Sequence, residues 1–309
     1  MFTPPFAAAG RTAPRGTMLL AVCLTLLATG SAGADDATKS APAQPKGLRV
    51  YSAGHSFHVF MPGILAEIAK SAGIEDHKQV GVSSIGGSYI HQHWAKEGDK
   101  SAKVAIVAEQ PDVFTMSPIY LPDDGIDNFV RLCSEKSSKT RILLQEFWLP
   151  FDVYDVDYKK KKMPAPDRDA MTVEYLRTEY GKYFKVMDEY VADLNRKYDR
   201  PIVAVVPVGQ AVVALREKVI AGEVPGVTKQ SELFTDPIGH CQAHIKVLNA
   251  YCHYAVIYGR SPVGLPAPSS LKGAGGDKEG AAKLNTLLQE IAWNAVVSHP
   301  LSGVKASAK

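Results

Sequence analysis

Five short segments rich in β-branched and other apolar residues recur along this chain of 309 residues, and stretches with helical spacing separate them. Near-continuous hydrophobicity, rather than alternation, is typical of parallel strands that are covered on both faces. Strands that alternate with helices in this way predict an α/β fold: a three-layer α/β/α sandwich around a five-stranded parallel sheet, of the flavodoxin-like kind. The expected strands are residues 48–53, 79–84, 112–116, 141–148 and 201–208.

The segments between the expected strands carry apolar residues on one helical face, most clearly at residues 173–198. Polar, proline-containing residues 152–171 interrupt this pattern and predict an insertion that can rim a cleft. The glycine-rich residues 273–280 are expected to form a surface loop. Further helices are expected around residues 57–69, 90–107, 129–132, 210–221, 243–258 and 281–298.

The N-terminus has the features of a secretory signal peptide. Two arginines precede an apolar stretch at residues 18–28, and a small-x-small motif ends at Ala34. The stretch is short for a membrane span, which needs about 20 apolar residues, so stable membrane insertion is not expected. Cleavage after residues 1–34 predicts a secreted or periplasmic protein, with residues 35–47 as a disordered linker and residues 48–309 as one domain.

Charge and cysteine content exclude several classes of function. The net charge of +3 is too small to indicate a nucleic-acid partner, and the basic run at residues 159–162 stands beside prolines, which favours a solvated loop. Processing leaves Cys133, Cys241 and Cys252, without a CxxC motif. An odd number with this spacing predicts neither a disulfide framework nor a zinc knuckle, although one bridge remains open.

Two distant segments together hold the groups that acyl transfer needs. Ser56 follows the first expected strand, and Asp236 and His240 lie almost two hundred residues later. If they meet, the chain has a hydroxyl nucleophile, an imidazole base and a carboxylate. Each has an alternative role: Ser56 as the N-cap of the following helix, and Asp236 as the cap of a helix entering at Pro237, with His240 only packing.

These motifs resemble the SGNH (GDSL-like) hydrolase superfamily. The similarity runs over about residues 48–265 and rests on Gly54-His55-Ser56, Gly86-Gly87-Ser88 and the Asp236–His240 pair. It implies that Ser56 is the nucleophile, His240 the general base and Asp236 the group that orients it. It also implies that the amides of Ser56 and of Gly86 or Gly87 form an oxyanion hole, and that no cofactor is required.

Three departures from the family pattern stand out. His55 occupies the position of the usual Asp or Asn, and no Asn follows the third expected strand, where Ser117 is either a replacement oxyanion donor or a turn residue. Gln145 is another candidate donor. Three residues rather than two separate Asp236 from His240, so either a bulge restores the contact or His240 acts in a dyad.

Several other residues have weaker functional interpretations. His91 and His93 form an HxH motif, but positions two apart on a helix diverge by about 200°, which disfavours a shared metal. The helix expected at residues 243–258 contains His244 and His253, which are expected to pack or to lie on the surface. Trp148 can line an apolar or sugar-stacking wall, although a core position is the default.

The sequence therefore predicts a secreted serine esterase that acts on a small-molecule or carbohydrate ester, with acetate on a sugar as the expected acyl group. The carbohydrate part follows only from the family resemblance and the expected secretion. The alternative is a non-catalytic relative that binds a glycan or a protein partner in the same cleft. Covalent labelling of Ser56 separates the two.

Overall fold

A five-stranded parallel sheet forms the centre of the computed structural model, which describes residues 45–99 and 101–306. The strand order is β2-β1-β3-β4-β5, which is the flavodoxin-like order. The predicted five-stranded α/β/α architecture is therefore confirmed. The strands are β1 (Arg49–Gly54), β2 (Lys78–Ser84), β3 (Val113–Met116), β4 (Arg141–Gln145) and β5 (Val203–Val206).

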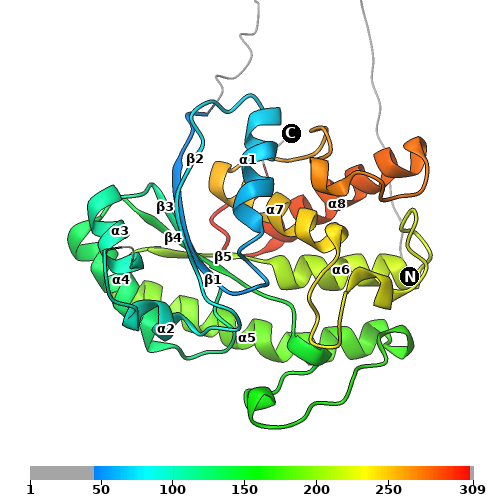
Figure 1. Ribbon diagram of the computed structural model, residues 1–309, viewed down its shortest axis with the longest axis horizontal. Coiled ribbons are helices and arrows are strands. Elements are labelled where there is room, and N and C mark those ends of the chain that lie inside the picture. Colours follow the sequence, from blue (N-terminus) through cyan, green and yellow to red (C-terminus); the bar gives the residue numbers. More distant parts are fainter. Residues whose placement is uncertain (1–44, 100, 307–309) are drawn as a thin grey trace, which may run out of the picture. The chain divides into compact units, whose positions relative to one another are not determined.

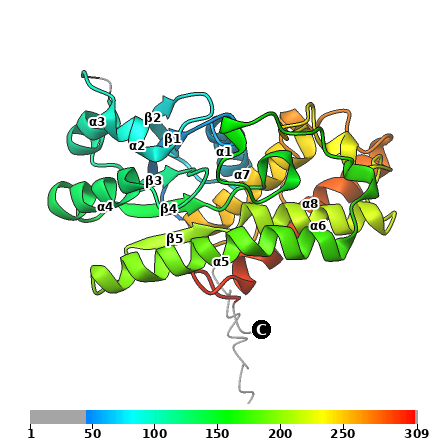
Figure 2. The same cartoon turned by 90° about the horizontal axis from the view of Figure 1, so that it is seen from below.

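Helices cover both faces of this sheet (Figures 1 and 2). Helices α2, α3, α4 and α5 form one layer, α1, α7 and α8 form the other, and α6 packs against α5, α7 and α8. The helices are α1 (Met61–Ser71), α2 (Ile90–Ala95), α3 (Ala102–Glu109), α4 (Asp124–Lys136), α5 (Val173–Lys197), α6 (Val208–Ile220), α7 (Ala243–Tyr258) and α8 (Lys278–Ser298).

Several boundaries differ from the sequence prediction. Strand β4 ends at Gln145 rather than at residue 148, and the helical stretch expected at residues 90–107 is divided into α2 and α3. Strand β5 ends before Pro207, which has no N–H to continue the ladder, and α6 starts at once. Helix α1 begins at Met61 rather than near residue 57, with Pro62 in its first turn, where proline is favoured. Helix α8 begins at Lys278, because the side chain of Asp277 caps it, so the glycine-rich loop ends earlier than residue 280.

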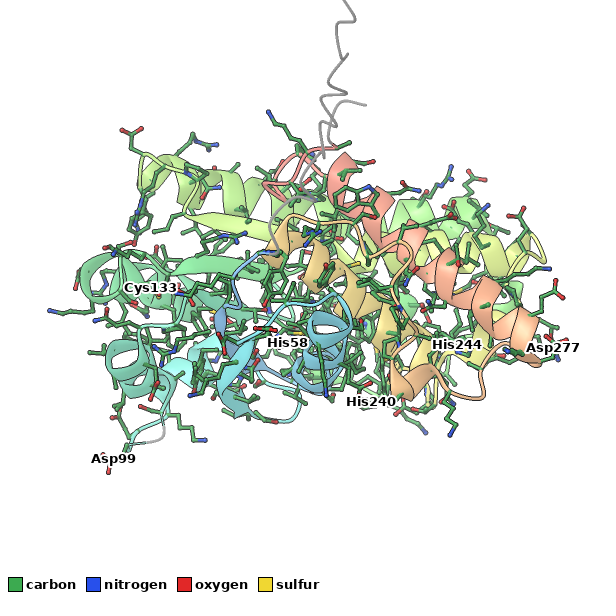
Figure 3. All side chains as sticks on the ribbon, turned by 90° about the horizontal axis from the view of Figure 1, so that it is seen from above. His58, Asp99, Cys133, His240, His244 and Asp277 are labelled. Atoms are coloured by element: carbon green, nitrogen blue, oxygen red, sulfur yellow. The ribbon has the colours of Figure 1, made fainter. Side chains whose placement is uncertain are left out.

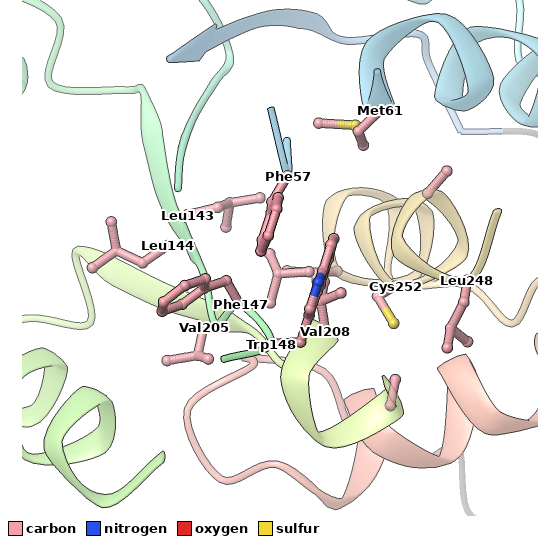
Figure 4. Packing of buried hydrophobic residues seen from close by; sticks show 14 of the residues in the cluster. Phe57, Met61, Leu143, Leu144, Phe147, Trp148, Val205, Val208, Leu248 and Cys252 are labelled. Carbon is pink, nitrogen blue, oxygen red and sulfur yellow. The ribbon is translucent and has the colours of Figure 1, made fainter. Parts of the chain in front are cut away.

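The hydrophobic core continues from the sheet to the loops at its carboxyl edge. Figure 4 shows Phe57, Phe147 and Trp148 packed together beside Val208 at the start of α6. All three aromatic side chains are almost fully buried. Because the loops that leave β1 and β4 share this core, the side chains at this edge have a rigid support.

Cys133, Cys241 and Cys252 are buried free thiols, so the bridge that the sequence left open does not form among them. Residues 1–44 lie outside the described part of the chain, and with them the expected signal peptide and most of the linker. Within the described residues, every helix is too short or too polar to cross a membrane.

Candidate active site

Ser56 lies two residues beyond the end of β1, in a series of turns that precedes α1. The N–H groups of His58 and Val59 donate to the carbonyl of His55, at 2.9 and 3.1 Å, and this bends the chain away from the sheet. The alternative role of Ser56 as a helix N-cap is therefore wrong, because α1 starts five residues later. The hydroxyl of Ser56 is free for another partner.

That partner is His240. The Ser56 hydroxyl lies 2.8 Å from Nε2 of His240, and Nδ1 of His240 lies 2.5 Å from Oδ2 of Asp236. A carboxylate can only accept, so Nδ1 carries the proton and Nε2 is free to accept from the hydroxyl. The structure thus brings together the three residues that the sequence singled out. The side chain of His240 is 41% exposed, and Figure 3 labels it near the edge of the domain.

The segment from Asp236 to His240 is a tight turn and not the start of a helix, so the predicted capping role at a helix is wrong. The turn lies between two residues that form an antiparallel bridge, Phe234 and Cys241. Oδ1 of Asp236 accepts the N–H groups of Gly239 and His240, at 2.9 and 3.0 Å. This turn accommodates the extra residue and keeps the carboxylate beside the imidazole.

The pKa of Asp236 is lowered from its usual value. Partial burial acts to raise it, but the hydrogen bonds from the His240 ring and from the two turn amides favour the charged form and outweigh burial. An ionised Asp236 stabilises the tautomer of His240 whose Nε2 accepts the hydrogen bond from the Ser56 hydroxyl.

Aromatic rings fix the position of the imidazole. The ring of Phe57 stacks on Trp148 with centroids 4.5 Å apart and meets His240 edge-on at 5.4 Å. Trp148 is fully buried, so its role as a core residue is confirmed, and its indole N–H donates to the carbonyl of Gly239 at 2.8 Å. These contacts leave His240 little freedom to turn away from Ser56.

Backbone N–H groups near Ser56 are free for a ligand. The amides of Ser56, Gly86 and Gly87 have no acceptor among the described residues. Gly86 and Gly87 occupy the centre of a turn closed by a bond of 3.3 Å from the N–H of Ser88 to the carbonyl of Ile85, and Gly87 has a φ of +58°. This conformation suits glycine. Gly87, unlike Gly86, lines the cavity beside Ser56.

Ser117 lies buried where β3 ends, between His55 and Gln145. The N–H of Phe57 donates to Nδ1 of His55 at 3.3 Å, which leaves a proton on Nε2 to donate to the Ser117 oxygen, also at 3.3 Å. Gln145 donates to the same oxygen at 3.3 Å, and to the carbonyl of Phe57 at 3.0 Å. The hydroxyl proton of Ser117 is therefore left for a further acceptor, whereas Gln145 has both amide protons engaged.

A small apolar cavity adjoins Ser56. Its volume is about 20 Å³, little more than the space that one water-sized sphere occupies. The insertion contributes Tyr158 to its wall, which agrees with the expectation that residues 152–171 rim a cleft. The cavity is lined by His55, Ser56, Phe57, Gly87, Ile119, Phe147, Pro150, Tyr158 and Ile238.

Lys159 is not the purely solvated residue that the sequence indicated. Its ammonium group donates to the carbonyl of Gly87 and lies 4.2 Å from the centre of the Tyr89 ring. Its neighbours Lys160 and Lys161 pair with Asp157 and Asp155. The insertion therefore folds back onto the turn that follows β2.

The two histidines of the HxH motif have different surroundings. His93 is buried between the hydroxyls of Ser83 and Ser88, at 2.8 and 2.7 Å, whereas His91 is half exposed near Asp123. The two do not share a site. His253, also buried, lies near Thr115.

Arg168 is the residue at this site that sequence reasoning missed. Its guanidinium group donates to two carbonyls of the turn that carries His240. In the sequence, Arg168 and Asp152 stand near the two ends of the insertion. Such a pair of opposite charges is common by chance, so it did not indicate a contact with the turn.

Comparisons with known proteins support the fold alone. No family model and no curated protein matches the sequence. A DUF4886 family protein from Bacteroides uniformis ATCC 8492 aligns with a TM-score of 0.52 and 14% identity, over 82% of this chain and 95% of that chain. A protein from Parabacteroides merdae ATCC 43184, described as a candidate GDSL-like lipase, aligns at 0.41 and 13%, over 70% of this chain and 98% of that chain. The first likeness shows a shared α/β/α fold, and the second is too weak to carry an argument.

Proposed function

We propose that this chain is a serine hydrolase of the SGNH type, which cleaves an ester through Ser56, His240 and Asp236. The observation that carries the proposal is the continuous series of hydrogen bonds from the Asp236 carboxylate through His240 to the Ser56 hydroxyl. A serine hydroxyl becomes an effective nucleophile when a neutral imidazole accepts its proton and a carboxylate stabilises the imidazolium that forms.

In the first half of the reaction, Ser56 attacks the ester carbonyl while His240 takes the hydroxyl proton. The negative oxygen of the tetrahedral intermediate accepts hydrogen bonds from the free amides of Ser56 and Gly87. Ser117 is fully buried and does not line the cavity, so it has no part in this step. His240 then protonates the departing alcohol. In the second half, water attacks the acyl-enzyme while His240 takes a proton from it, and His240 then gives that proton to the Ser56 oxygen as the carboxylic acid leaves.

The cavity beside Ser56 supports a short acyl group. Its small volume and apolar walls suit a methyl group and exclude a long chain. We therefore expect acetate esters to react faster than butyrate esters. A carbohydrate as the alcohol part, and export through cleavage after residue 34, rest on the family resemblance and on the composition of the N-terminus.

Hydrolysis of p-nitrophenyl acetate by the purified protein tests this function. We expect wild-type protein to release p-nitrophenol and Ser56→Ala to lose that activity, since removal of the nucleophile eliminates the acyl-enzyme route. Ser138→Ala is the matched control, because Ser138 is exposed on a distant loop and should leave the rate unchanged. Equal rates for wild type and Ser56→Ala would refute the nucleophile. A wild type without any activity would favour a binding protein.

A further inference from the structure

The turn that carries Asp236 and His240 is held in place from outside by two buried side chains. Arg168 donates from Nη1 to the carbonyl of Asp236 at 2.9 Å and from Nη2 to the carbonyl of Pro237 at 2.8 Å. Trp148 donates to the carbonyl of Gly239 at 2.8 Å. Three carbonyl groups of one short turn are thus bound by side chains from two other segments.

Arg168 is itself fixed by a buried carboxylate. Its Nε donates to Oδ2 of Asp152 at 2.7 Å, and the two side chains are only 7% and 1% exposed. Asp152 also accepts from the hydroxyl of Tyr180 at 2.6 Å and from Arg216. Because the planar guanidinium group uses Nε and both terminal nitrogens at once, its orientation is determined on three sides.

The turn needs such support because its backbone is irregular. Gly239 has a φ of +106°, and no helix or strand of regular hydrogen bonds continues through residues 236–240. The turn nevertheless decides where the His240 ring points. Its ring nitrogens must reach Asp236 and Ser56 together, at 2.5 and 2.8 Å.

We propose that Arg168, held by Asp152, is a positioning residue that aligns the Asp236–His240 turn with Ser56. This inference rests on the proposed hydrolase function. It also gives the insertion a second role: Tyr158, in the middle of residues 152–171, lines the cavity, while Asp152 and Arg168 at the two ends secure the base. Arg168 touches no reacting atom and acts only through the turn.

Two conservative variants test whether these hydrogen bonds position the turn. Arg168→Lys keeps the charge but cannot serve three acceptors in one plane, and Trp148→Phe keeps the aromatic stack but removes the N–H donor. For each we expect kcat to fall by roughly 10- to 100-fold with KM almost unchanged, because a small displacement of the base affects the chemical step and not ground-state binding.

A spectroscopic readout separates positioning from general destabilisation. In wild type, the Nδ1 proton of His240 should give a low-field proton NMR signal through its short bond to Asp236, and His240→Gln assigns that signal. We expect Arg168→Lys to shift or broaden it at temperatures where the protein remains folded. Arg177→Lys is the matched control, because Arg177 is exposed and pairs with Glu217 away from the turn, and it should change neither kcat nor the signal.

An Arg168→Lys protein with wild-type kcat and an unchanged low-field signal would overturn the inference. If the wild type were inactive, the proposed function would fail, but the low-field signal of His240 would still test whether Arg168 positions the turn. If the wild type were active and Ser56→Ala inactive, but Arg168→Lys and Trp148→Phe were both fully active, only the positioning role of Arg168 would be refuted.

Discussion

At the scale of single residues, the two oxygens of Asp236 have separate partners. Oδ1 accepts the amides of Gly239 and His240, whereas Oδ2 accepts the ring N–H of His240. One oxygen therefore shapes the turn, and the other sets the tautomer of the imidazole. This division allows an Asp and a His separated by three residues to meet in a single contact.

Asp236→Asn should retain the turn and lose the chemistry. The remaining oxygen of the side chain stays with the two amides, so its NH₂ group faces Nδ1 of His240. Two donors cannot share that contact, and the imidazole moves its proton to Nε2, where it no longer accepts from Ser56. We expect kcat to fall by up to about 10⁴-fold, with the melting temperature nearly unchanged.

Steady-state hydrolysis of p-nitrophenyl acetate measures this effect. Asp193→Asn is the control, since Asp193 is an exposed carboxylate that pairs with Arg196 on α5. A kcat for Asp236→Asn close to that of wild type would show that His240 does not need the carboxylate.

At the scale of elements, the short turn after β2 brings a backbone amide to the edge of the sheet where Ser56 lies. Strand β1 pairs with β2 and with β3 in parallel, so the loops that leave these strands emerge together. The left-handed backbone of Gly87 places this residue in the wall of the cavity, and the insertion contacts its carbonyl through Lys159.

Gly87→Ala should lower both stability and activity. The left-handed conformation costs alanine about 1–2 kcal/mol, which lowers the free energy of unfolding by that amount. Relaxation of the turn also displaces a proposed oxyanion donor, so we expect kcat to fall by about 10²-fold. Gly222→Ala is a matched control: its φ is +72° and an added Cβ meets no atom within 4 Å. Urea unfolding should show similar losses of stability for the two variants. Measurement of kcat should show a loss of activity for Gly87→Ala alone.

At the scale of the whole molecule, burial keeps several titratable groups neutral. Desolvation lowers the pKa of His55 and His253 to about 3 and that of His58 and His93 to about 4. Desolvation also raises the pKa of Glu146 to about 8. These five side chains are almost fully buried. Figure 3 labels one of them, His58, near the middle of the domain.

The protein should be most stable near pH 6.5. Below that pH, these four histidines bind protons in the unfolded chain but stay neutral in the folded protein. The free energy of unfolding therefore falls by up to about 1.4 kcal/mol per pH unit for each histidine. Glu146 has the opposite effect from about pH 4.5 to 8, since only the folded state retains its proton there. Below pH 6.5, the effect of the four histidines on stability is larger than that of Glu146. Between about pH 6.5 and 8, Glu146 is the one of these five groups that still changes stability with pH.

Urea unfolding across this pH range provides the test, with Glu146→Gln as the variant that should remove the decline above pH 6.5. A stability that stays constant from acid to neutral pH would mean that the buried histidines accept protons in the folded state.

Local patterns predicted the fold because buried parallel strands and amphipathic helices each leave a signature within a few residues. The five strands were found for this reason. The start of α1 was misplaced, since the turns at residues 55–60 depend on hydrogen bonds to His55 that no periodicity reveals. The motifs around Ser56 and His240 identified side chains that do lie within hydrogen-bond distance, although their catalytic roles remain predictions.

The contacts of the insertion were not predictable from the sequence. Arg168 reaches a turn 68 residues later through bonds to carbonyl oxygens, and any residue type supplies such an acceptor. Lys159 contacts Gly87 across 72 residues. Contacts of this kind depend on how an irregular segment folds back, and composition alone had indicated only a solvated loop.

The most direct test of the hydrolase proposal is to locate the covalent adduct. Wild-type protein is treated with a fluorophosphonate probe, digested and analysed by mass spectrometry. We predict one modified peptide with the probe on Ser56, labelling that p-nitrophenyl acetate slows by competition, and no adduct in His240→Gln. An unlabelled wild type, or an adduct on a serine other than Ser56, would contradict the account.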